Sequence, residues 1–81
     1  MYTLYALHER ICYGIFATKD EAQYRMEHEW DEDRRFFGED KCHGFVRDGF
    51  ATLWELETLK DISSYAIIEI KNVAKYKENT I

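Results

Sequence analysis

Residues 18–38, TKDEAQYRMEHEWDEDRRFFG, decide the fold, because this segment contains a complete set of helix start and stop signals. Thr18 is a favourable N-cap residue, and Glu21, three positions later, completes a capping box in which each side chain accepts a hydrogen bond from the other's backbone N–H. Gly38 can take the left-handed conformation that ends a helix. The segment therefore predicts a helix over residues 19–37, roughly 28 Å long.

One side of this helix is apolar, which predicts that it packs against a sheet. The apolar side chains that fall within roughly 80° on a helical wheel are Ala22, Met26, Trp30 and Phe37. Asp33 falls inside the same stripe and interrupts it. We therefore expect the helix to bend or end near Asp31, with Phe36 and Phe37 packing from a separate turn.

The same segment carries the whole net charge of the protein. The chain has a net charge of −5, and residues 18–40 hold nine acidic and four basic residues, whereas the rest of the chain holds seven of each. Glu21 with Arg25, and Asp31 with Arg35, are spaced as i,i+4 ion pairs. This concentrated negative charge argues against direct binding of nucleic acid and favours a protein with a basic surface as the partner.

Five carboxylates on the outer side of the helix are the candidate partner-binding residues. They are Asp20, Glu21, Glu27, Asp31 and Glu32. Carboxylates spaced along a rigid helix form a directional negative surface, which speeds encounter with a basic partner and fixes its register. A charge run of this kind is also typical of a solvated helix face without a partner, and the sequence leaves both interpretations open.

Strand-forming segments flank the helix on both sides. The predicted strands are residues 2–7, 11–16, 42–47, 50–52 and 65–73. Residues 8–10 form the expected hairpin loop between the first two strands, and Gly14 predicts a bulge in the second. Asp48-Gly49 is a strong turn signal.

Residues 53–62 fit two interpretations. Thr52 and Glu55 repeat the capping-box spacing, which favours a second helix. The apolar residues at helical spacing that support it are Leu53, Leu56, Leu59 and Ile62. The alternative is a strand through Leu56, because apolar or β-branched side chains also recur at every second position from Phe50.

Length and composition predict one α+β domain over residues 1–81, with a polar tail from about residue 74. We expect a small antiparallel sheet of three to five strands packed by one long helix, in the order β-β-α-β-α-β if the second helix forms. No segment resembles a signal peptide, and none approaches the roughly 20 apolar residues of a membrane span. We therefore expect a cytoplasmic protein with no membrane partner.

The predicted strands are apolar on both faces, and such a sheet needs cover on both sides. One helix covers only one side. Aromatic residues make up 16% of the chain, more than a small core needs, and the candidate interface aromatics are Tyr5, Tyr13 and Tyr65. An alternative function follows from this pattern, namely a structural homodimer that buries the second sheet face against a copy.

A third alternative is a metal- or thiol-dependent small enzyme. The residues that could supply zinc ligands are His8, Cys12, Cys42 and His43. Their spacing fits no common zinc module, and Cys42 and His43, as neighbours in a strand, point to opposite faces and make a poor nucleophile–base pair. We therefore expect that Cys12 and Cys42 are reduced and buried, and we expect no catalytic residues, no metal site and no cofactor.

The opening Leu4-Tyr5-Ala6-Leu7-His8 and the segment GIFATKDEA at residues 14–22 resemble a pattern in small proteins of bacteriophages and prophages. In those proteins a strand and a loop precede Gly-aliphatic-aromatic-x-Ser/Thr, which leads into a helix. The resemblance covers the first quarter of the chain and transfers no functional residues. It implies a protein that binds and inhibits a host protein, including defence systems such as CRISPR complexes. We therefore predict a non-enzymatic protein-binding module, an anti-CRISPR or other anti-defence inhibitor, that engages a basic host surface through its acidic helix and exposed aromatics.

Overall fold

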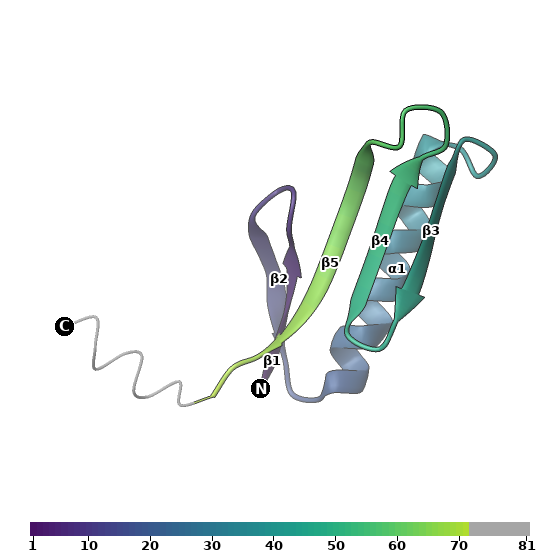
Figure 1. Ribbon diagram of the computed structural model, residues 1–81. Coiled ribbons are helices and arrows are strands. Elements are labelled where there is room, and N and C mark those ends of the chain that lie inside the picture. The colour runs from purple at the N-terminus through teal and green to yellow at the C-terminus, as the bar shows by residue number, and fades with distance from the viewer. Residues whose placement is uncertain (72–81) are drawn as a thin grey trace.

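Two strands, one helix and three further strands follow one another in the computed structural model, which describes residues 1–71 (Figure 1). The elements are β1 (Tyr2–Ala6), β2 (Ile11–Phe16), α1 (Lys19–Phe37), β3 (Cys42–Arg47), β4 (Phe50–Glu55) and β5 (Asp61–Glu69). The strands form one antiparallel sheet in the order β2-β1-β5-β4-β3. The α+β prediction is confirmed. The expected polar tail from residue 74 lies outside the described residues.

The helix begins and ends where the local sequence signals place it. The Thr18 side chain accepts a hydrogen bond from the Glu21 N–H at 3.2 Å. At the other end, the Gly38 N–H donates to the Arg34 carbonyl at 3.0 Å, and Gly38 has a φ of 120°, which glycine adopts without strain. Local chemistry therefore determines both boundaries of α1.

The predicted break near Asp31 is wrong, because α1 continues without interruption to Phe37. Asp33, the polar residue in the apolar stripe, accepts a hydrogen bond from the Tyr65 hydroxyl. A buried polar group is tolerated when it has such a partner. The helix therefore keeps Asp33 on its sheet-facing side.

Tyr65 is a core residue, which corrects its assignment as an interface aromatic. Its side chain is only 1% exposed. It lies on β5, the middle strand, with Ala6 as its partner on β1 and Ala51 on β4. The two alanines leave space for the large ring on the helix side of the sheet. The buried residues of this cluster are Leu4, Ala6, Met26, Ala51 and Tyr65.

The second helix predicted at residues 53–62 is wrong, and the alternative strand is confirmed. β4 runs to Glu55, and β5 begins at Asp61, four residues earlier than predicted. β4 pairs with β3 on one side and β5 on the other, so its backbone groups are hydrogen-bonded along both edges. This pairing outweighs the helical spacing of the leucines, and Leu56 and Leu59 instead lie exposed in the loop.

The β1–β2 hairpin and its bulge are confirmed. Thr3 pairs with Ile15 and Tyr5 with Cys12, so β2 has one residue more than β1 across this interval. Gly14 lies in the bulge with a φ of 77°. The loop of this hairpin contains no glycine, and Arg10 adopts its positive φ, which is 60°.

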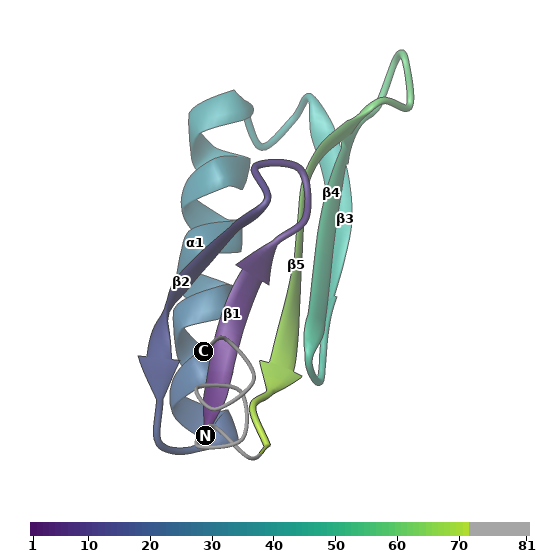
Figure 2. The same ribbon diagram turned by 90° about the vertical axis from the view of Figure 1, so that its left-hand side faces the viewer.

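Side-chain hydrogen bonds that the sequence pattern did not predict connect the helix to the β3–β4 hairpin. The Gln23 amide donates to the Arg47 carbonyl at 2.9 Å and accepts from the Gly49 N–H at 2.8 Å. The Trp30 indole N–H donates to the Thr52 carbonyl at 2.8 Å. Figure 2 shows the result, with α1 on one side of the sheet and no other described element on the opposite side.

Replacing Tyr65 with Phe tests the contact between the middle strand and the helix. The free energy of unfolding at pH 7 should fall by about 1–3 kcal/mol, because the Asp33 carboxylate loses its hydrogen-bond donor. Urea denaturation would measure the change. Tyr24→Phe, at a position 76% exposed on the helix, is the matched control and should change stability by less than about 0.5 kcal/mol. Equal effects of the two substitutions would contradict this role of Tyr65.

Stability should also fall at alkaline pH. Burial and the hydrogen bond to Asp33 raise the pKa of Tyr65, and the hydrogen bond to Glu9 raises the pKa of Tyr13 to about 12. The folded state therefore retains protons that the unfolded chain loses above about pH 10. Unfolding free energies measured from pH 8 to 11.5 should decline above about pH 10, by up to about 1.4 kcal/mol per pH unit for each tyrosine. A Tyr65→Phe variant with an equally steep decline would exclude Tyr65 as a cause.

Candidate protein-binding surfaces

The outer side of α1 presents exposed carboxylates, as the sequence predicts. Asp20, Glu21 and Glu27 are exposed and form no ion pair within residues 1–71. Glu32 is also exposed, and it lies 3.4 Å from the His28 imidazole. Four of the five candidate carboxylates are therefore accessible to a partner.

Asp31 differs from the other four. Its carboxylate is half-buried and lies 2.7 Å from the Arg34 guanidinium and 3.0 Å from that of Arg35. The hydrogen bond from Arg34 lowers the pKa of Asp31 below its usual range. The expected pair with Arg35 is thus present, whereas Arg25 pairs with Glu29 at 2.8 Å instead of Glu21. Asp31 is neutralised within the helix and contributes least to the negative surface.

Two exposed aromatic side chains accompany these carboxylates. Tyr24 is 76% exposed and lies within one turn of both Asp20 and Glu27, and Phe36 is 95% exposed and lies one turn after Glu32. Both aromatics fall outside the apolar stripe, and the expectation that Phe36 packs from a separate turn is wrong. We call the set Asp20, Glu21, Tyr24, Glu27, Glu32 and Phe36 the outer helix face.

A shallow groove of about 420 Å³ lies between this face and the edge strand β3, and its lining residues are Tyr24, Glu27, His28, Trp30, Asp31 and Val46. A separate hollow of about 510 Å³ lies near the end of α1, lined by Glu32, Asp33, Arg35 and Phe36. The lining of the groove combines aromatic rings with carboxylates, which suits a long basic side chain.

The face of the sheet opposite α1 forms a second surface. The strand pairing places sixteen side chains there. We call this the open sheet face, and its residues are Thr3, Tyr5, Leu7, Cys12, Ile15, His43, Phe45, Arg47, Phe50, Thr52, Trp54, Asp61, Ile62, Ser64, Ala66 and Ile68. No helix among residues 1–71 lies against it, and Figure 1 views the sheet with α1 behind β3 and β4. The expectation of a sheet apolar on both faces is confirmed.

Aromatic rings pack against one another on the β3–β4 half of the open sheet face. Phe45 lies 6.2 Å from both Phe50 and Trp54, and His43 meets Trp54 edge-on at 5.4 Å, measured between ring centroids. The Arg47 guanidinium lies 4.6 Å from the centroid of the Phe45 ring. These contacts hold the rings in place at the surface.

The three candidate interface aromatics lie in three different environments. Tyr5 lies half-buried on the open sheet face, and Tyr65 lies in the core. Tyr13 packs against the core on the helix side, where its hydroxyl donates to Glu9 at 2.8 Å and its ring lies 5.5 Å below the Arg25 guanidinium. Only Tyr5 therefore lies on a face that is free of α1.

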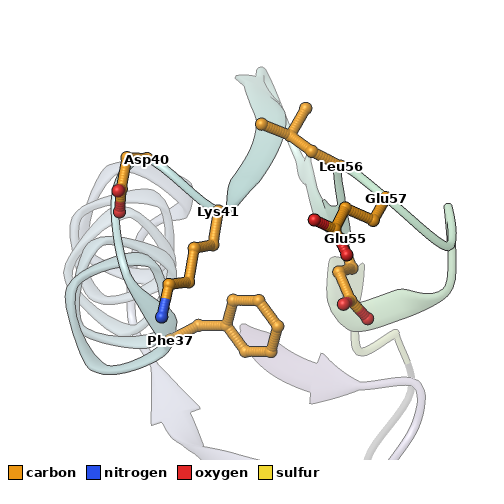
Figure 3. Close-up of a pocket in the computed structure, with 6 residues that line it drawn as sticks. All are labelled: Phe37, Asp40, Lys41, Glu55, Leu56 and Glu57. Carbon is orange, nitrogen blue, oxygen red and sulfur yellow. The ribbon is translucent and has the colours of Figure 1, made fainter.

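A pocket of about 480 Å³ lies where the end of α1 approaches the loop after β4 (Figure 3). Its lining residues are Phe37, Asp40, Lys41, Glu55, Leu56 and Glu57. In Figure 3 the Lys41 side chain extends beside Phe37, and Glu55 and Leu56 lie across the gap. None of these six residues is a Ser, Cys or His, so the lining offers no nucleophile–histidine pair.

The cysteine and histidine residues weighed as metal ligands lie apart. His8 and Cys12 belong to the β1–β2 hairpin, and Cys42 and His43 to β3 at the opposite edge of the sheet. Within residues 1–71 no three His, Cys, Asp or Glu side chains converge on a point that could hold a metal ion. Both thiols are free, Cys12 is exposed, and the expectation that both are buried holds for Cys42 alone.

Cys42 serves the end of the helix. Its thiol donates to the Gly38 carbonyl at 3.2 Å, and burial raises its pKa, which keeps it protonated. His43 lies on the other face of β3, against Trp54. The two side chains therefore do not form a nucleophile–base pair.

Within residues 1–71 the structure contains no helix that is both long and apolar enough to cross a membrane.

The comparisons with known proteins found no relative. No protein-family model, no curated protein and no solved structure matches the chain.

Proposed function

We propose that this protein is a non-enzymatic protein-binding module whose outer helix face engages a partner protein with a basic surface. The observation that carries the proposal is the exposure of two aromatic rings among uncompensated carboxylates, with Phe36 95% and Tyr24 76% exposed. Aromatic residues are enriched at protein interfaces and costly to leave in water. A helix face that serves only for solubility would present polar residues at both positions.

The charges of the outer helix face support a basic partner. Asp20, Glu21 and Glu27 form no ion pair in the described part of the chain, so these carboxylates are free to pair with a partner's Lys or Arg side chains. The groove between Tyr24 and Val46 would accept the stem of such a side chain, with the carboxylate of Glu27 at its rim. The aromatic rings would make apolar contact with the partner, and the carboxylates would speed the encounter and fix the orientation of the complex.

The resemblance of the first quarter of the chain to small phage proteins extends this proposal to an inhibitor of a host protein in the cytoplasm, of the anti-CRISPR or other anti-defence type. Rigid placement of the face on a capped helix suits an inhibitor, because little conformational entropy is lost on binding.

A capture experiment with matched charge variants tests the proposal. Wild-type protein, a Glu27→Lys/Glu32→Lys variant and a Glu57→Lys/Glu69→Lys control would each be immobilised and exposed to a bacterial lysate, and bound proteins would be identified by mass spectrometry. Both variants change the net charge equally, but only the first alters the outer helix face. Wild type and control should retain the same partner at low salt, and the helix variant should retain an amount of that partner at least tenfold lower.

A further variant, Phe36→Ser, separates the aromatic contribution from the charge. It should weaken binding of the captured partner without changing the dependence on salt, because it removes apolar contact and no charge. If both charge variants retain equal amounts of every protein, the acidic helix face is only a solvated surface and the proposal fails. Circular dichroism spectra should be the same for all variants, since exposed substitutions usually change stability by less than about 0.5 kcal/mol.

A further inference from the structure

The open sheet face contains one carboxylate, that of Asp61, which pairs with Trp54 at the start of β5, although the chain carries sixteen acidic residues and a net charge of −5. Its other charged residue is Arg47. Large apolar side chains remain exposed on it, with Ile15 at 60%, Ile68 at 45% and Leu7 at 41%. Contiguous apolar surface of this kind marks an interaction site.

The distribution of charge indicates what covers this face. The net negative charge is concentrated between residues 18 and 40, and α1 holds most of it on the opposite side of the sheet. Two copies that met through their helices would repel each other. Two copies that met through their open sheet faces would instead hold their acidic helices on the outside, separated by the full thickness of both sheets.

The composition of the open sheet face argues against two other classes of partner, nucleic acids and strongly charged proteins. A nucleic acid would need several basic residues beside the aromatic rings, and Arg47 alone does not neutralise a phosphate backbone. A strongly charged protein would leave its own charges buried and unpaired against Ile15 and Ile68. A second copy presents the same largely apolar surface, on which only Arg47 and Asp61 are charged.

We propose that the chain forms a homodimer in which the open sheet faces of two copies pack against each other. Five strands at about 4.8 Å and six residues at about 3.3 Å give each face roughly 24 by 20 Å. This is smaller than the roughly 800 Å² per partner of a standard interface, so dissociation in the micromolar range is expected. The packed sheets would form the two-layer β arrangement with side chains from both inner faces interdigitated.

The dimer gives the outer helix face a second property. Each copy keeps α1 on the outer side, so the assembly presents two outer helix faces in opposite directions. Two partner molecules would then bind to one dimer, on its opposite sides. Dimer formation does not depend on the partner-binding function proposed above, because the two surfaces share no residue.

Sedimentation velocity over a range from 1 to 300 μM tests the dimer. Wild-type protein should shift from monomer to dimer with increasing concentration, and Ile68→Lys on β5 should remain a monomer throughout. Because a lysine in the middle strand could unfold the domain, Ile15→Lys on the edge strand β2 is a second variant with the same expectation. Phe36→Lys is the matched control, since it places a lysine on the other side of the molecule, and it should dimerise like wild type.

Three outcomes would overturn the proposal. The first is a wild-type protein that remains monomeric up to 300 μM, and the second is a dimer that persists in both folded open-face variants. The third is a dimer lost in Phe36→Lys alone, which would assign the contact to the helices. The first two results do not bear on the capture experiment, and the third would assign the outer helix face to contact between copies, so failure of the dimer and failure of the partner-binding function are distinguishable.

Discussion

The contact between Tyr65 and Asp33 is the interaction on which the rest of the structure depends. Tyr65 lies on the middle strand, where it fills the space above Ala6 and Ala51 on the two neighbouring strands. Its hydroxyl reaches the only carboxylate in the apolar stripe of the helix. A purely apolar contact would allow α1 to rotate or slide over the sheet, whereas this hydrogen bond fixes which side of the helix faces inward.

Side-chain contacts to the β3–β4 hairpin determine the position of the helix along the sheet. Gln23 binds the turn through both atoms of its amide, and Lys19 pairs with Asp48 at 3.0 Å beside it. Trp30 reaches the backbone of β4 two turns later. With rotation and position both fixed, the outer helix face and its exposed aromatics are held rigidly away from the sheet.

The ratio of one helix to five strands has a direct consequence for function. One helix is about 10 Å wide and covers one face of the sheet, so in the described part of the chain the second apolar face has no cover. Negative charge and apolar surface are thereby separated onto opposite sides of a small domain. This separation permits two kinds of association, an electrostatic one through the helix and an apolar one through the sheet, without interference between them.

The sequence by itself determined the elements whose signals are local. Thr18 and Gly38 define the ends of α1. Asp48-Gly49 defines the turn between β3 and β4, and Gly14 defines the bulge in β2. Each of these signals acts through neighbouring backbone groups. The sequence also proposed five carboxylates on the outer side of the helix, four of which are accessible, since charged side chains outside the apolar stripe stay in water.

Tertiary structure decided the features that depend on distant pairing. Residues 53–55 became a strand because β3 and β5 bind both of its edges, although local spacing favours a helix. Tyr65 entered the core because Ala6 and Ala51, far away in sequence, lie beside it, and Asp33 stayed in the helix because Tyr65 supplies its hydrogen-bond donor. Local patterns contain no information about such partners, since which residues meet is settled only when the strands pair and the helix packs against them.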